Sequence, residues 1–313
     1  MRLLLVGCTG FVGRELVPQL LAAKHQLILV SRKAASGFDQ ARQAGQLEWL
    51  QINPADPDSW LDGPLLTALA QVEGVVNLAG EPIAEQRWTA SHCQKLESSR
   101  LDTTRALVKA MNQLKTPPRV LLNASAVGYY GTSPDGYFTE KSPCGQDFLA
   151  HLCERWEAAA AAKPSATRLV VVRIGIVLGP DGGALGKMLP VFRLGIGGPV
   201  GSGLQWMSWI HRTDLCQLIE KALEERAWSG VVNGVAPEPV PMASFAAVLG
   251  KTLGRPSLLP VPGPLLKILL GDGARVVLEG QQVVSERLAG LGFRFKYPDL
   301  CQALSAATMP TPH

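Results

Sequence analysis

The chain opens with MRLLLVGCTGFVG, residues 1–13, and this stretch decides the fold. A continuous apolar run of strand length, residues 3–6, leads directly into glycines at positions 7, 10 and 13, and a helical pattern follows over residues 15–23. A glycine loop between a strand and a helix is suited to the pyrophosphate of a dinucleotide, because the helix N-terminus offers free N–H groups to the anion. We therefore predict that this loop contacts a cofactor through Gly7, Thr9, Gly10, Phe11, Val12 and Gly13.

Strand-length apolar runs alternate with helix-period segments as far as residue 172. Runs that are buried on both faces and separated by helices form a parallel sheet. The sequence thus predicts an α/β fold, a Rossmann-type doubly wound parallel sheet with a small C-terminal domain on the substrate side. We expect the NADP-binding domain to span residues 1–236, with lid loops at about 179–204, and the small domain to span residues 237–313.

The end of the second strand indicates which dinucleotide is bound. An NAD-preferring site usually carries a carboxylate there for the ribose hydroxyls, but this chain has Ser31, Arg32 and Lys33. A guanidinium and an ammonium can hold a 2′-phosphate, so we expect NADP(H) as the cofactor. The alternative is that Arg32 and Lys33 are only a solvated strand end. At a later strand end, the small residues around Leu78, Ala79 and Gly80 leave space for the adenosine side of the cofactor.

Composition narrows the class of protein. Of the 313 residues, 47% are hydrophobic and 18% are charged, which suits a globular chain. The positive and negative residues that give the net charge of +4 are scattered along the chain, which argues against a nucleic-acid partner.

Six separated cysteines, without CxxC or zinc spacing, predict no metal site and a reducing compartment. With no secretory signal, we expect a cytoplasmic protein. The apolar stretch 258–270 is too short to span a membrane, and either a core helix or a peripheral membrane contact would explain it.

The chain resembles the extended short-chain dehydrogenase/reductase superfamily, and within it the "epimerase family" proteins similar to sugar-nucleotide epimerases. The resemblance runs nearly end to end through the glycine loop and the motifs at 77–83, 99–105, 124–131, 173–179, 209–214 and 278–295. It implies that Ala124 and Arg173 lie with the cofactor-binding residues and that the tail forms the small C-terminal domain of this subgroup. Cyanobacterial and chloroplast members are linked to cell or plastid division, so the resemblance also allows a division protein as partner.

The reaction of this superfamily needs a Ser or Thr, and a Tyr and a Lys four residues apart on the next helix, where the Lys lowers the pKa of the Tyr. Ser125 stands at the Ser position, but aligning Glu157 with the acid of that helix places Leu149 and Cys153 at the Tyr and Lys positions. A literal Tyr137-x-x-x-Lys141 exists, but its flanking prolines and glycine predict a loop.

The candidates that remain for catalysis are Ser125, Tyr129 and Glu140. Two functions stay open. The chain is either an NADP-dependent oxidoreductase or epimerase acting on an unknown small molecule, or a non-catalytic NADP(H)-binding scaffold or regulator.

Overall fold

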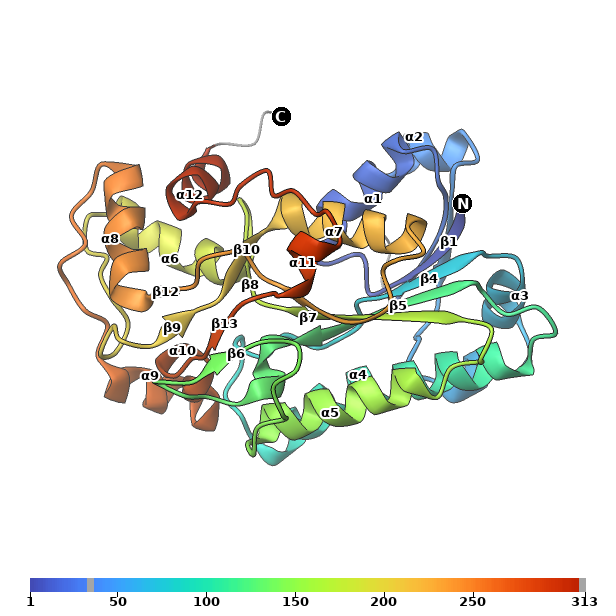
Figure 1. The fold of residues 1–313 in the computed structure, drawn as a ribbon, viewed down its shortest axis with the longest axis horizontal. Helices are drawn as coiled ribbons and strands as arrows, with labels where there is room; N and C mark the ends of the chain where they lie inside the picture. Colours follow the sequence, from blue (N-terminus) through green and yellow to red (C-terminus); the bar gives the residue numbers. More distant parts are fainter. Residues whose placement is uncertain (33–36, 310–313) are drawn as a thin grey trace.

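Seven parallel strands form the central sheet of the computed structural model, which describes residues 1–32 and 37–309 (Figure 1). The strand order is β11-β7-β5-β4-β1-β2-β3, so the order reverses between β1 and β4. In such sheets, ligands bind outside the carboxyl ends of the strands at this reversal. The predicted doubly wound sheet is confirmed. The strands are β1 (Arg2–Val6), β2 (Gln26–Ser31), β3 (Leu47–Gln51), β4 (Gly74–Asn77), β5 (Val120–Ala126), β7 (Arg168–Ile174) and β11 (Gly230–Gly234).

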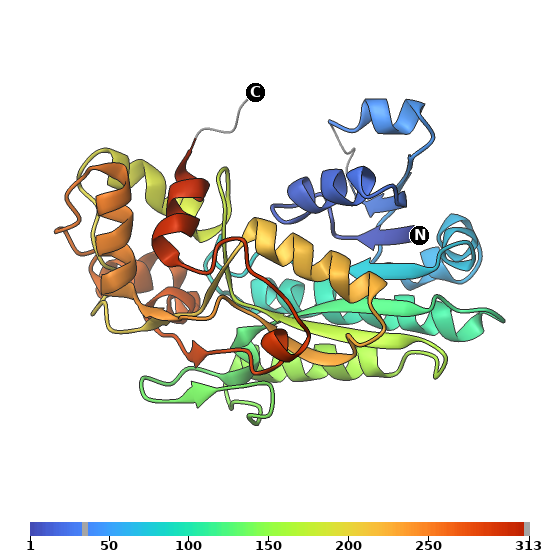
Figure 2. The ribbon, with the colours of Figure 1, turned by 45° about the horizontal axis from the view of Figure 1, so that its top comes forward.

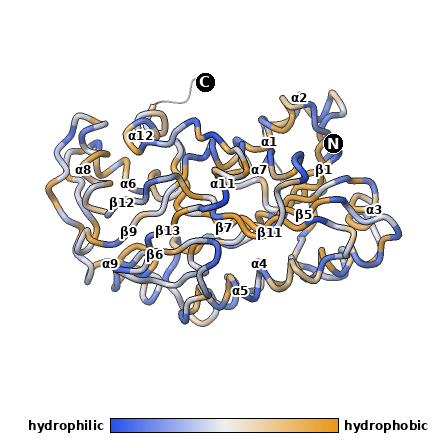
Figure 3. The backbone as a smooth tube through the Cα atoms, in the orientation of Figure 1, coloured by the Kyte–Doolittle hydropathy of each residue, from blue (hydrophilic) through white to orange (hydrophobic). Residues whose placement is uncertain are grey.

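Helices cover both faces of the sheet (Figures 1 and 2). Side chains that alternate along β1 point to opposite faces, so Leu3 and Leu5 join one buried cluster and Leu4 and Val6 the other. Figure 3 shows the sheet as the most apolar part of the trace. One face carries α1 (Gly13–Ala22) and α7 (Arg212–Glu224), and the other carries α3 (Pro64–Ala70), α4 (Ala90–Gln113) and α5 (Phe148–Ala161).

A smaller region lies beyond the carboxyl ends of the strands (Figure 1). Its core joins residues 178–209 to the C-terminal helices. Its elements are β8 (Ile176–Leu178), α6 (Gly183–Arg193), β9 (Trp206–Met207), β10 (Trp209–His211), β12 (Val240–Pro241), α8 (Met242–Leu253), α9 (Gly263–Leu270), α10 (Arg275–Leu278), β13 (Gln282–Val283) and α12 (Leu300–Thr308). Helix α11 (Arg287–Gly290) instead packs on β11, and its Leu288 joins the core of the sheet. The 3-10 turn Asp272–Ala274 joins α9 to α10, and β6 (Tyr137–Phe138) pairs with β13. Short elements elsewhere are α2 (Asp39–Gln43) and the 3-10 turns Pro57–Trp60 and Val127–Tyr130.

Two expectations need correction here. The stretch 179–204 is not all loop, because helix α6 occupies its centre and buries Leu185, Leu189 and Phe192 at helical spacing. Helix α9 is not a core helix, because none of its residues is buried and Ile268 is 68% exposed. Among the described residues, no helix is both long and apolar enough to cross a bilayer. The division at residue 237 stays a prediction.

Candidate functional site

The three glycines of the first loop differ in what surrounds them. Gly7 has a φ of +77°, and a Cβ atom there would lie 2.5 Å from the backbone nitrogen of Ala79. A Cβ atom at Gly13 would lie 1.8 Å from the carbonyl oxygen of Cys8. At Gly10 a Cβ atom would meet no protein atom within 4 Å. Protein packing therefore explains why Gly7 and Gly13 are glycines, and the open space beside Gly10 fits a ligand that approaches the backbone closely.

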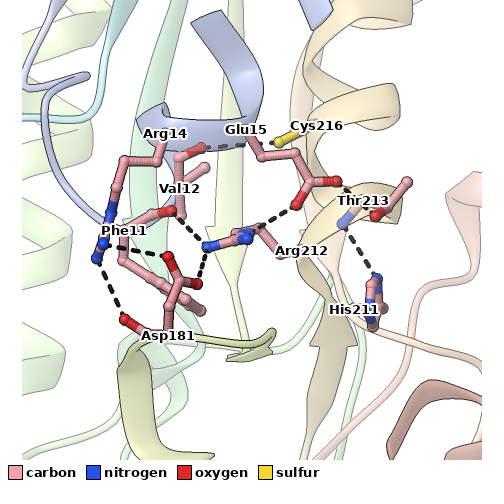
Figure 4. A network of polar contacts seen from close by, with 9 residues as sticks. All are labelled: Phe11, Val12, Arg14, Glu15, Asp181, His211, Arg212, Thr213 and Cys216. Carbon is pink, nitrogen blue, oxygen red and sulfur yellow. Dashed lines mark hydrogen bonds and ion pairs between the residues drawn. The ribbon is translucent and has the colours of Figure 1, made fainter. Parts of the chain in front are cut away.

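A clamp of ionic contacts holds this loop against two other segments (Figure 4). The Arg212 side chain, 8% exposed, donates to a Glu15 carboxylate oxygen at 2.6 Å, to Asp181 Oδ1 at 2.8 Å and to the Phe11 carbonyl at 3.3 Å. Arg14 also contacts Asp181, at 3.1 Å. We call these five residues the Arg212 clamp. These contacts join the start of α1 to the start of α7 and to the loop before α6.

The end of β2 carries the residues that the sequence analysis predicts to hold a 2′-phosphate. Ser31 is buried and its hydroxyl accepts a hydrogen bond from Trp49 Nε1 at 2.9 Å. Arg32 has a 69% exposed side chain whose nearest described carboxylate is Glu81, at 3.7 Å. So long a contact at an exposed position holds the guanidinium weakly and leaves it available to an incoming phosphate. Lys33 lies outside the described residues.

The ends of β4 and β5 complete the predicted cofactor edge. Leu78 donates its N–H to Val6, and Ala79 donates its N–H to the side chain of Asn77. Gly80 lies against Arg100, whose guanidinium carbon would be 2.9 Å from an added Cβ atom. Ala124 is buried in the neighbouring strand. These residues and the glycine loop all lie at the carboxyl edge of the sheet.

Ser125, Glu157 and Arg173 form a buried polar group, here called the Ser125 cluster. The Ser125 hydroxyl donates to Glu157 Oε1 at 2.6 Å, and Arg173 donates to both Glu157 carboxylate oxygens at 2.8 Å. Ser125 is only 3% exposed, and the Arg173 side chain 4%. Burial would lower the pKa of Arg173, but its bonds to Glu157 and Tyr130 raise it overall, so the guanidinium stays charged.

Two tyrosines surround Arg173. The guanidinium carbon lies 3.3 Å from the centre of the Tyr129 ring, and Nη1 donates to the Tyr130 hydroxyl at 2.9 Å. The Tyr130 hydroxyl in turn donates to Asn233 at 2.7 Å. Burial raises the pKa of Tyr129 although Arg173 opposes the shift, so its phenol remains protonated near neutral pH. Tyr129 therefore lies at the site but is a poor base. Arg173, expected among the cofactor residues, bonds within the Ser125 cluster, and its contact with a cofactor stays a prediction.

The helix after Ser125 is α5, as predicted, and it places Leu149 and Cys153 on the side facing the Ser125 region. Leu149 Cβ would lie 3.5 Å from a Cβ atom added at Gly128. Cys153 is buried, and burial raises the pKa of its thiol to about 11. Neither side chain can exchange a proton with a substrate near neutral pH. Glu157 lies four residues after Cys153 and therefore on the same face of α5. This spacing is the sequence signal that places Glu157 near Ser125.

Glu140, Tyr137 and Lys141, the other candidates from the sequence, make contacts that hold the fold together. Glu140 accepts hydrogen bonds from the Asn233 N–H at 3.0 Å, from the Ser285 hydroxyl and from the Glu286 N–H, so its carboxylate holds three segments together and does not reach Ser125. Tyr137 is in β6 and Lys141 is in the following turn, 86% exposed and paired with Glu286. The structure thus confirms that this Tyr and Lys share no helix.

The comparisons with known proteins agree with this geometry. The sequence pattern of the NAD dependent epimerase/dehydratase family matches residues 3–233. The chain belongs to this family. A second pattern, described as a domain of unknown function (DUF1731), matches residues 261–307.

Its relatives share nearly the whole chain. The Arabidopsis thaliana epimerase family protein SDR39U1 homolog, chloroplastic, is 44% identical over 302 residues, which cover 96% of this chain and 84% of the relative. Human epimerase family protein SDR39U1 is 39% identical over 308 residues, covering 97% and 98%. The crystal structure of human SDR39U1 (isoform 2) with NADPH matches with a TM-score of 0.87 and 38% identity, covering 98% of this chain and 99% of that one. The predicted resemblance is confirmed.

Proposed function

We propose that the chain is an NADP(H)-binding protein that does not use the tyrosine–lysine proton transfer of short-chain dehydrogenases. The residues present fit the cofactor: the open space at Gly10, beside the N-terminus of α1, suits a pyrophosphate, and the exposed Arg32, with Lys33 as the sequence predicts, suits a 2′-phosphate. When bound, the nicotinamide accepts or supplies a hydride. The human relative crystallised with NADPH supports the choice of NADP(H).

The closed Ser125 cluster is the observation that carries the second half of the proposal. In the superfamily reaction a Tyr anion accepts the substrate proton while the Ser hydroxyl orients the substrate. Here the positions of the Tyr and Lys hold Leu149 and Cys153, and the Ser125 hydroxyl donates its hydrogen bond to Glu157 Oε1. The cluster satisfies its own hydrogen bonds and leaves Ser125 almost fully covered. We therefore favour cofactor binding without turnover over the usual dehydrogenase or epimerase reaction.

A second candidate function rests on the same short contact. A hydroxyl that donates to a carboxylate at 2.6 Å can pass a substrate proton to that carboxylate, so Ser125 and Glu157 could serve a slow oxidoreductase or epimerase. This function requires Ser125 to become accessible. Substrate panels containing carbonyl compounds and sugar nucleotides, with NADP(H) present, distinguish the two functions.

Cofactor binding is tested by calorimetric titration. We expect NADPH to bind more tightly than NADH, and Arg32→Ala to weaken NADPH about 5- to 30-fold, the effect of one charge-assisted contact at an exposed position, with NADH unchanged. Arg226→Ala is the matched control, because it removes another exposed arginine that lies far from Arg32 in the sequence. This variant should leave NADPH affinity unchanged. Equal affinities for the two cofactors, or an unaffected Arg32→Ala protein, would remove Arg32 from the site.

Turnover is tested on the wild type beside Ser125→Ala, Glu157→Gln, Tyr137→Phe and Lys141→Ala. We expect slow or undetectable reaction in all five proteins and intact NADPH binding in those that fold. Robust activity that Ser125→Ala and Glu157→Gln abolish would establish the oxidoreductase. Robust activity lost in the Tyr137 and Lys141 variants would show that the exposed pair is catalytic.

A binding module of this kind would act through another protein. The resemblance permits a division protein as that partner. The test is whether the protein captures such a partner only when NADPH is added. We also propose a reducing, cytoplasm-like setting, because all six cysteines are unpaired. A protein isolated with a disulfide would contradict that setting.

A further inference from the structure

Three side chains that can ligate a metal meet at the start of α5. The donor atoms of Cys144, His151 and Glu154 all lie within 4.8 Å of one another. They come from the loop before α5 and from its first turns, and none of them takes part in the proposed cofactor site. We propose that these three residues bind one Zn²⁺ ion at the rim of the Ser125 cluster.

The donor set suits zinc better than other common divalent cations. Thiolate, imidazole and carboxylate are the ligands that Zn²⁺ takes in proteins, whereas Mg²⁺ and Ca²⁺ prefer oxygen alone. Zinc bonds of about 2.0–2.3 Å hold tetrahedral donors about 3.3–3.7 Å apart. His151 Nδ1 and Glu154 Oε2 are already 3.8 Å apart. A thiolate and a carboxylate also supply the two negative charges that neutralise the ion.

The backbone presents these donors in fixed positions. His151 and Glu154 are three residues apart on α5 and so share one face of the helix. Asp147 caps the helix by accepting a hydrogen bond from Ala150 at 2.9 Å. Gly145, next to Cys144, donates its N–H to the Tyr129 carbonyl at 2.9 Å and lies so close to Gly131 that a Cβ atom would be 2.6 Å from the Gly131 nitrogen. Cys144 is therefore held beside α5 by backbone contacts.

The site is open to solvent and close to the Ser125 cluster. Cys144 is partly buried, whereas His151 and Glu154 are exposed, so an ion can enter and keep a water as its fourth ligand. Burial raises the pKa of the Cys144 thiol, and the charges of Glu154, Glu157 and Asp147 add to this while Arg173 opposes it. Bound zinc would fasten the loop that contacts Tyr129 to α5.

A second cluster provides an internal comparison. His25, Glu220 and Glu224 also have donor atoms within 4.8 Å of one another, but this group has no sulfur. His25 Nε2 already faces Glu224 at 3.3 Å, and the main-chain nitrogen of Met1 lies 3.2 Å from Nδ1. Any ion held there would give no sulfur charge-transfer band. The His25→Ala variant removes that cluster without touching α5.

The experiment titrates the purified full-length protein with Co²⁺ and then with Zn²⁺, and records absorption and heat. We expect one Co²⁺ per chain with a near-ultraviolet sulfur-to-cobalt band, displacement by one Zn²⁺, and the same result in His25→Ala and Cys301→Ser, which removes an exposed cysteine elsewhere. Cys144→Ser should abolish the band. His151→Ala and Glu154→Gln should each weaken Zn²⁺ binding at least about tenfold, because loss of even a residue that only supports a ligand costs about that much. A missing band, or one that survives in Cys144→Ser, overturns the site.

A chemical readout checks the assignment independently. Zn²⁺ should protect Cys144 from alkylation by iodoacetamide while Cys301 reacts at its usual rate, as measured by peptide mass spectrometry. Equal labelling of Cys144 with and without Zn²⁺ contradicts the proposal. NADPH affinity is measured on the same variants, and because these residues lie outside the cofactor loop, the zinc result holds whether or not the proposed cofactor function is correct.

Discussion

Gly10 shows how a single residue can report on an absent ligand. Its two partner glycines are required by the protein itself, but a side chain at Gly10 meets nothing until a cofactor is present. We expect Gly10→Val to fold normally and to bind NADPH at least about 100-fold more weakly, the cost of occupying space that the pyrophosphate needs.

Circular dichroism and calorimetric titration measure the two effects. Gly290→Val is the matched control, because a Cβ atom there also meets no atom within 4 Å and Gly290 is far from the loop in sequence. If Gly10→Val binds NADPH as well as the wild type does, the loop is not the phosphate site.

At the scale of elements, the Arg212 clamp joins α1, α7 and the loop before α6. Arg212→Gln leaves the Glu15 and Asp181 carboxylates without their shared cation, and both are partly exposed, so we expect a loss of about 2–3 kcal/mol rather than the full cost of a buried unpaired charge. NADPH affinity should fall as well, because the cofactor loop is no longer held.

Urea unfolding and titration of the same protein check this prediction. Arg14→Gln, which removes an exposed arm of the clamp, should change the free energy of unfolding by less than about 1 kcal/mol. Equal losses in the two variants would show that burial of Arg212 does not determine the strength of the clamp.

At the scale of the whole molecule, one histidine should make stability depend on pH. His211 is 4% exposed, its Nδ1 accepts the Thr213 N–H at the start of α7, and burial lowers its pKa from 6.5 to about 4. Between these pH values the unfolded chain binds a proton that the folded chain does not. The free energy of unfolding should therefore fall as the pH drops through this window, by up to about 3 kcal/mol.

His211→Asn isolates this contribution. Asn can still cap the helix, so the variant should fold, but it cannot titrate. We expect the wild type to lose more stability than His211→Asn between pH 6.5 and 4 in urea unfolding. Parallel curves for the two proteins would rule out His211 as the source.

Local sequence patterns predicted most of the fold. The glycine loop and the alternation of apolar runs with helical segments depend on neighbours in the chain, so the parallel sheet, α1 and α5 could be predicted from them. Helix α6 was missed because its glycines and proline resemble a loop, whereas burial of Leu185, Leu189 and Phe192 against α8 and α12 stabilises a helix. The sequence left open whether α9 is buried or exposed, because its apolar residues look the same in a core helix and on a surface.

The sequence by itself determined the family, the glycine loop and the absence of Tyr and Lys from the two key positions of α5, because each depends on residues at short, regular spacing. Only the tertiary structure joined Ser125 to Glu157 and Arg173, brought Arg212 to Glu15 and Asp181, and placed Cys144 beside His151 and Glu154. Most of these contacts link residues on separate elements, and no local pattern encodes which strand or loop will lie opposite another. Their formation follows from how the sheet and its helices pack.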